Sequence, residues 1–168
     1  LTDPTVDEVW RAIEARWSEL IFESPWLAAQ QKRLARRYAR GVADYLRDAA
    51  AAGREVAAAE QRFEVAVDRA VVSGIVDRIE RDADGRVRII DVKTGTPVTD
   101  AKARDNAQLG AYQLAYAEGA FDEVLDALGA HTADGARLLF VREGVKGSSY
   151  REATQPVLDA DDLDAFRE

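Results

Sequence analysis

Three charged side chains in the stretch GIVDRIERDADGRVRIIDVKTG, residues 74–95, have the types and spacing needed for metal-dependent hydrolysis. Asp77 lies within one run of alternating apolar and polar residues, and Asp91 and Lys93 end a second such run. Carboxylate oxygens bind Mg²⁺ and Mn²⁺, and a nearby ammonium can orient a water molecule and offset charge that builds on a phosphate. These side chains therefore have the chemistry for hydrolysing a phosphodiester bond.

The two runs flank the turn sequence DADG, which is typical of a β-hairpin. If the connection is a three-residue loop that ends with Gly85 in the left-handed conformation, the pairing places Asp77 opposite Asp91. Because side chains alternate along a strand, Lys93 then shares the face of Asp91. Opposed carboxylates repel each other, and a divalent cation between them removes the conflict. The carbonyl of Val92, where pairing stops, would supply a further oxygen ligand.

Each of these charges also has an ordinary explanation. Asp91 and Lys93 could be solvated residues at a strand end, and Asp77 with Arg78 could form a surface ion pair that contributes less than about 1 kcal/mol. The matched positions of the two acids across the turn, and the Thr-Gly that follows the lysine, favour a functional site.

The segments around the hairpin are predicted from hydrophobic periodicity and turn residues. A helical period covers residues 5–52, with a break at 24–26, where Ser24 is a candidate N-cap before Pro25. The further predicted elements are strands over 59–67, 71–79 and 86–93, a loop over 94–104, helices over 105–118 and 121–128, strands over 136–142 and 150–154, and a C-terminal tail that is a short acidic helix or frays. This order predicts an α/β fold with helices packed against a sheet.

Cationic residues cluster on one side of the second predicted helix, at Lys32, Arg33, Arg36, Arg37 and Arg40. They could contact phosphate groups. The commoner reason for such a stripe is the solvated face of an amphipathic helix.

Composition limits the class of protein. The chain has 168 residues, of which 47% are hydrophobic and 32% charged, as in a single globular domain. Its net charge of −8 argues against binding nucleic acid through bulk electrostatics, but not against a local contact. Without cysteine, a secretory signal or an apolar run that could span a membrane, the chain is expected to be cytoplasmic and free of disulfides. The lack of methionine and the start at Leu1 suggest a segment of a longer protein.

The quoted stretch, followed by NAQLGAYQLAYAEG, resembles the RecB-like branch of the PD-(D/E)XK nucleases. That branch typically shows an acidic-x-x-Phe strand, then G-x-x-D-R-(I/V), a turn, (V/I)-(V/I)-D-x-K-T-G and a helix with Q-L-x-x-Y. The resemblance covers residues 57–120 with specific motifs and extends more loosely over the chain, including SPW and QPVL. It points in particular to the C-terminal nuclease domain of bacterial UvrD-like helicases of the AdnB type, which process DNA double-strand breaks.

This resemblance implies a restriction-endonuclease-like core, with a central mixed sheet of four to five strands flanked by helices and preceded by N-terminal helices. The whole chain is expected to be one nuclease domain, with helices over 1–54, the core over 57–155 and a tail over 156–168, excised from a longer ATP-dependent helicase–nuclease.

The resemblance also assigns roles to the hairpin residues. Asp77 and Asp91 match the two metal-binding acids, and Lys93 matches the catalytic lysine. The Val92 carbonyl would be an additional metal ligand. The implied cofactor is Mg²⁺ or Mn²⁺.

Auxiliary residues follow from the same comparison. Glu60 resembles the acid on the preceding strand, with Glu64 as the rival for that role, and Gln108 and Tyr112 match Q-L-x-x-Y. The last two would steady the lysine end of the site or touch the DNA backbone, although core packing is the simpler role for Tyr112. Many members also have a metal-ligating His before the sheet, whereas the sole histidine here, His131, follows the motif and is expected to be a surface loop residue.

The expected function is a metal-dependent DNA nuclease domain, with exonuclease activity in double-strand break processing and recombinational repair. The expected partners are DNA, the helicase or translocase domains of the parent chain and a second helicase–nuclease subunit. Arg33, Arg36, Arg37 and Arg40 are weak candidates for contacts to DNA. The alternative is a catalytically silent RecB-like domain that guides DNA or docks a protein, which the acidic surface and the missing histidine favour.

Overall fold

The computed structural model describes residues 4–142 and 147–167. Its elements are α1 (Val6–Ala15), η1 (Trp17–Glu19), α2 (Pro25–Ala51), β1 (Glu55–Val67), β2 (Ala70–Arg81), β3 (Arg86–Lys93), α3 (Asp100–Arg104), α4 (Ala107–Ala117), α5 (Asp122–Leu125), η2 (Asp126–Leu128), β4 (Thr132–Phe140), β5 (Arg151–Gln155) and α6 (Ala160–Arg167). No helix in this described part of the chain is both long and apolar enough to cross a bilayer.

The chain divides into two compact units. The first, here the helical unit, comprises Leu1–Ala52, Lys93–Pro97 and Phe140–Arg151. The second, the sheet unit, comprises Gly53–Val92, Val98–Leu139 and Glu152–Glu168.

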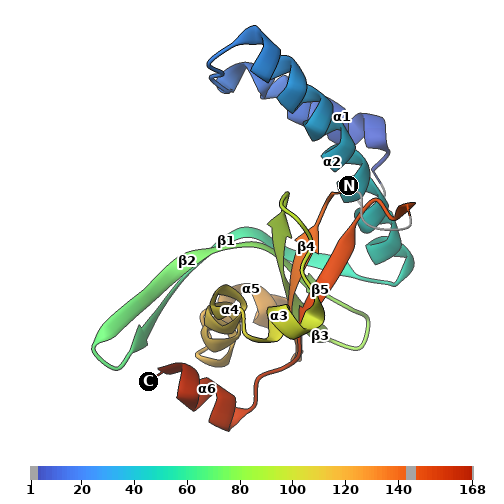
Figure 1. The fold of residues 1–168 in the computed structure, drawn as a ribbon. Coiled ribbons are helices and arrows are strands. Elements are labelled where there is room, and N and C mark those ends of the chain that lie inside the picture. Colours follow the sequence, from blue (N-terminus) through green and yellow to red (C-terminus); the bar gives the residue numbers. More distant parts are fainter. Residues whose placement is uncertain (1–3, 143–146, 168) are drawn as a thin grey trace. The chain divides into compact units, whose positions relative to one another are not determined.

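In the helical unit, α1 runs beside α2 (Figure 1). The predicted break between the two helices is confirmed, because the Ser24 side chain accepts a hydrogen bond from the Leu27 N–H at 3.2 Å and Pro25 is the first residue of α2. Trp10 is buried between the helices, with Arg36 of α2 lying 5.4 Å from the centre of its ring. This pairing explains the apolar spacing that predicted both helices.

Most of the sheet lies in the second unit, where Figure 1 shows a long β1–β2 hairpin curving beside α4 and α5. The strand order is β1-β2-β3-β4-β5, and both β1–β2 and β2–β3 are antiparallel. Thr132 N–H donates to the Gly85 carbonyl at one end of β3–β4, and Val141 N–H donates to the Lys93 carbonyl at the other, each at 3.0 Å, so these strands are parallel. The predicted α/β fold with a mixed sheet and flanking helices is confirmed.

The core of the sheet unit lies between the sheet and α4. Phe63 of β1 contacts the rings of Tyr112 and Phe121 edge to face, with ring centres 5.8 and 6.0 Å apart. Leu109 and Leu114 of α4 are fully buried. The helix is therefore fixed against the strands that carry the charged residues of the hairpin.

Some boundaries differ from those predicted. β1 begins at Glu55 and β4 at Thr132, each four residues early, because the exposed ends of these strands lack the alternation used to find them. The predicted loop over 94–104 contains the short helix α3, which begins where the Thr99 side chain accepts a hydrogen bond from Lys102 N–H. The C-terminal tail is helical, as α6.

Candidate active site

The β2–β3 hairpin has the predicted register. Its pairs run from Arg81–Val87 to Arg78–Ile90, and the next position along both strands holds Asp77 and Asp91. Gly85 has a φ of +81° and ends the three-residue loop, as predicted. The loop therefore sets which two acids face each other.

Asp77 reaches across to the backbone of β3. Its Oδ2 accepts a hydrogen bond from Val92 N–H at 2.7 Å. Since Val92 directly follows Asp91, this bond holds the Asp77 carboxylate at the end of β3 where the other acid lies. The Asp77 side chain of β2 is thus joined to the backbone of β3 at the point that the register predicts.

Asp91 is held by α4. It is only 3% exposed, and its Oδ1 lies 3.1 Å from the hydroxyl of Tyr112. The same hydroxyl lies 3.2 Å from the carbonyl of Ile75, and it accepts a hydrogen bond from Gln108 Nε2 at 2.7 Å. Gln108 and Tyr112 lie one helical turn apart on one face of α4. Gln108 can therefore bond to the same hydroxyl that contacts Asp91.

The pKa of Tyr112 depends on both Asp91 and Asp77. Burial, followed by the negative charge of Asp91 and, more weakly, of Asp77, raises the pKa of Tyr112 to about 12. The hydroxyl is therefore neutral and a hydrogen-bond donor near pH 7. Of the two carboxylates, Asp91 makes the direct contact with this hydroxyl, at 3.1 Å.

Lys93 belongs to the helical unit and is the last residue of β3. Its side chain is half-buried, and its carbonyl accepts the hydrogen bond from Val141 N–H at 3.0 Å. The backbone of the lysine is thereby fixed to the end of β4.

Glu60 of β1 lies opposite Asp77 in the β1–β2 register, between the pairs Ala59–Arg78 and Gln61–Val76, whereas Glu64 lies further along the strand. Glu60 is exposed and has a φ of 51°, and Glu64 is exposed and pairs with Ser73 of β2. Across residues 4–142 and 147–167, no three His, Cys, Asp or Glu side chains form a group that could hold a metal. Neither glutamate is therefore gathered with Asp77 and Asp91, and a ligand role for Glu60 stays a prediction.

His131 is not the surface loop residue expected from the sequence. It precedes β4 with only 16% of its side chain exposed. Its Nδ1 lies 2.8 Å from the hydroxyl of Tyr116, and its Nε2 lies 3.5 Å from Asp126. Ring packing against Tyr116, which sequence spacing did not suggest, holds the histidine against α4.

The cationic residues of α2 differ in their surroundings. Lys32 forms an ion pair with Glu14 at 2.7 Å, and Arg36 packs on Trp10, so both serve the contact with α1. Arg33, Arg37 and Arg40 are exposed.

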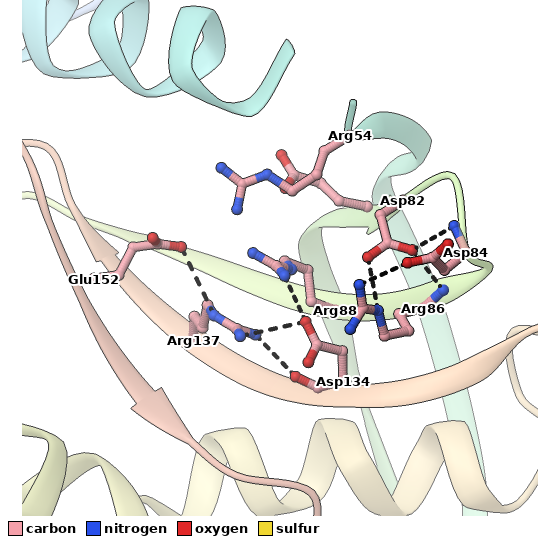
Figure 2. Close-up of polar contacts among 9 residues, drawn as sticks. Arg54, Asp82, Asp84, Arg86, Arg88, Asp134, Arg137 and Glu152 are labelled. Atoms are coloured by element: carbon pink, nitrogen blue, oxygen red, sulfur yellow. Dashed lines mark hydrogen bonds and ion pairs between the residues drawn. The ribbon is translucent and has the colours of Figure 1, made fainter. Parts of the chain in front are cut away.

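A layer of charged residues crosses the sheet, and no motif in the sequence predicted it. Figure 2 shows Arg88, Asp134, Arg137 and Glu152 joined in a chain of ion pairs from β3 to β5, at 2.5, 3.3 and 3.9 Å. On β2, Glu80 is fully buried and pairs with Arg78 at 2.6 Å and with Arg54 at 3.8 Å. Glu80 also lies opposite Arg88 in the hairpin register.

The charged layer lies on the sheet face that turns away from α4, since Val87 and Ile89, the neighbours of Arg88, line a cavity with Gln113 and Tyr116 of that helix. Its acids and arginines neutralise one another in a half-buried setting. The charged layer therefore stabilises the face of the sheet that lies away from α4.

Replacing Glu80 with glutamine tests this role. The substitution keeps the shape of the side chain but leaves Arg54 and Arg78 beside a neutral amide, so we expect the free energy of unfolding to fall by about 3 kcal/mol. Urea denaturation followed by circular dichroism would measure the change. The matched change at the exposed Glu64 should alter stability by less than about 0.5 kcal/mol. Equal stability of the two variants would contradict a structural role for Glu80.

The donor set at the end of the hairpin suits a hard divalent cation. Asp77 and Asp91 supply carboxylate oxygens, and Val92 adds a carbonyl just beyond the last β2–β3 pair, in a residue that is 37% exposed. All of these donors are oxygens, which Mg²⁺ and Mn²⁺ prefer over softer ligands.

Comparison with known families agrees with this chemistry. The family model described as the PD-(D/E)XK nuclease superfamily matches residues 2–168. A comparison with curated proteins gave no match.

Proposed function

The chain belongs to the PD-(D/E)XK nuclease superfamily, whose members are in general metal-dependent nucleases, and from this we propose that it hydrolyses phosphodiester bonds in DNA with Mg²⁺ or Mn²⁺. The observation that supports the proposal most strongly is the meeting of two acids at the end of the β2–β3 hairpin. Asp77 is bound to Val92 N–H, Asp91 is bound to Tyr112, and both charges act on the Tyr112 hydroxyl.

In the proposed mechanism, Asp77, Asp91 and the Val92 carbonyl hold the divalent ion. The ion, when bound, acidifies a coordinated water and polarises a phosphoryl oxygen. Tyr112 and Gln108 keep the Asp91 carboxylate in place through the hydrogen bonds described above. Holding a charged ligand in position before substrate arrives lowers the cost of reorganisation during the reaction.

We assign Lys93 to the phosphate and its attacking water. It follows Asp91 by two positions on β3, and alternation along a strand directs such residues to one face. Its ammonium would orient the water for attack on phosphorus and offset the negative charge that grows on the phosphoryl oxygens as one ester oxygen leaves. The bond from Val141 fixes the backbone from which the side chain extends.

Dependence on metal ions tests the proposal. Incubated with linear DNA, the chain should release products in Mg²⁺ or Mn²⁺ and none in excess EDTA, because removing the ion leaves two uncompensated carboxylates facing the phosphate. Gel analysis of end-labelled single- and double-stranded substrates would measure this. Cleavage that continues in EDTA would contradict the proposal. A covalently closed circle should survive if the activity is that of an exonuclease.

The resemblance of the hairpin and α4 motifs supports a more specific assignment. We propose that the domain works with an ATP-dependent helicase of the AdnB type in processing DNA double-strand breaks in the cytoplasm. Coexpression with such helicase domains, followed by ATP-dependent degradation of linear duplex DNA, would test that association.

A silent module that only guides DNA is the second candidate. The net charge of −8 and the lack of a third clustered metal-binding side chain among the described residues favour it. DNA binding without cleavage in either metal would support this candidate over the nuclease.

A further inference from the structure

We propose that Arg37, Tyr38 and Arg142 form a binding site for one backbone phosphate of DNA. The inference rests on the proposed nuclease function and deepens it. Of the four arginines of α2 that the sequence analysis offered as DNA contacts, the proposal selects Arg37. It adds Arg142, which lies outside that helix.

The site is a cavity of about 160 Å³ within the helical unit, lined by Leu34, Arg37 and Tyr38 of α2 and by Arg142, which follows β4. Both arginines are exposed. Within 4–142 and 147–167, neither guanidinium has an ion pair or hydrogen bond to another residue. Among the residues that the structure describes, no carboxylate lines this cavity, so the two arginines repel each other and an anion would relieve that repulsion.

The chemistry of the lining suits a phosphate. A guanidinium presents a planar set of N–H donors that matches phosphate oxygens, often in pairs. The Tyr38 hydroxyl offers a further donor to the same oxygens. A diester phosphate of DNA has one negative charge, and two arginines can share it.

Close packing fixes the backbone positions from which the two arginines extend. Gly41 lies one turn after Arg37, and a Cβ added there would be 2.7 Å from the Val141 carbonyl oxygen and 2.6 Å from that of Ser149. The helix backbone therefore approaches the segment next to Arg142 more closely than any side chain at Gly41 would allow. A binding site held by backbone contact needs little reorganisation when ligand enters.

Side chains reinforce this contact further along α2. Ser149 donates a hydrogen bond to Asp44 at 2.6 Å, and Tyr150 donates one to Asp48 at 2.7 Å. The Tyr150 ring also packs edge to face on Tyr45, with centres 5.4 Å apart. These contacts hold α2 against Ser149 and Tyr150.

The backbone next to Arg142 is bonded to Lys93, the residue proposed to act on the reacting phosphate. Arg142 directly follows Val141, whose N–H donates to the Lys93 carbonyl at 3.0 Å. A DNA strand with its reacting phosphate at Lys93 would therefore have another phosphate within reach of Arg142. The site would hold the strand in register while the bond is cut.

Binding in EDTA isolates this site from catalysis. The anisotropy of a labelled oligonucleotide would be measured with the wild-type chain and with R37Q, R142Q and the charge-matched R11Q, which alters an exposed arginine of α1. We expect R37Q and R142Q each to weaken binding about tenfold and R11Q less than about twofold. A plot of log affinity against log salt concentration should become less steep by about one in R37Q, in R142Q and in the double variant. The single and double variants should change equally because both residues contact the same phosphate. R37K, which keeps the charge but not the planar donors, should restore binding only in part.

The phosphate site would be refuted if the wild type did not bind DNA in EDTA, or if R37Q and R142Q bound DNA as R11Q does. It would also be refuted if the variants lost binding of inorganic phosphate in calorimetry but kept their affinity for DNA. Thermal melting would confirm that the variants fold. A chain that shows the expected binding differences but cuts no DNA in Mg²⁺ or Mn²⁺ would refute the nuclease function alone. Normal cleavage with unaffected variants would refute the phosphate site alone.

Discussion

Replacing Asp91 with asparagine is expected to reduce metal-dependent DNA cleavage by about a thousandfold or more. The amide keeps the shape of the side chain and its hydrogen bond from Tyr112, but it removes one of the two negative charges that would hold the cation. Initial rates on labelled DNA at saturating Mg²⁺ would measure the loss.

The hairpin provides its own control for this variant. Asp84 lies in the turn of the same hairpin, is exposed and pairs with Arg86, so D84N should cleave like the wild type. D91N should melt close to the wild type, because its amide oxygen can still accept the hydrogen bond from Tyr112. Cleavage by D91N within tenfold of the wild type would refute the metal-ligand assignment.

Replacing Lys93 with methionine is expected to lower the cleavage rate by about a hundredfold to a thousandfold. Methionine keeps most of the aliphatic length and removes the ammonium that would stabilise charge in the transition state. Because that charge develops only during the reaction, the loss should be seen in kcat, with a much smaller change in KM. Single-turnover rates at several DNA concentrations would separate the two.

The matched variant here is K102M. Lys102 is an exposed residue of α3, and its replacement should leave kcat unchanged. If K93M and D91N both cleave like the wild type, the activity lies elsewhere and the silent-module function becomes the better description of the hairpin.

The hairpin was predictable because its geometry is local. Gly85 and a short loop fix the register, and the register alone brings Asp77 and Asp91 together. The superfamily predicted from the motifs around these residues is confirmed by the family match over 2–168. The helix with Gln108 and Tyr112 was predicted for the same reason, since its period and its motif lie within one short segment.

Other parts of the site depend on contacts between distant segments, which a single sequence does not reveal. The Q-L-x-x-Y motif selected Tyr112, but its bond to Asp91 requires the packing of α4 on the sheet. The left-handed backbone of Glu60 has no glycine to signal it. Asp134 and Arg137 pair with residues on other strands, and Arg142 meets Arg37 only because Gly41 admits a close approach.

The raised pKa of Tyr112 also bears on how the site responds to pH. A phenol whose pKa is raised to about 12 stays protonated throughout the neutral and mildly alkaline range. Its hydrogen bond to Asp91 is therefore kept at any pH at which cleavage would be measured. Loss of activity at mildly alkaline pH should accordingly not arise from ionisation of this tyrosine.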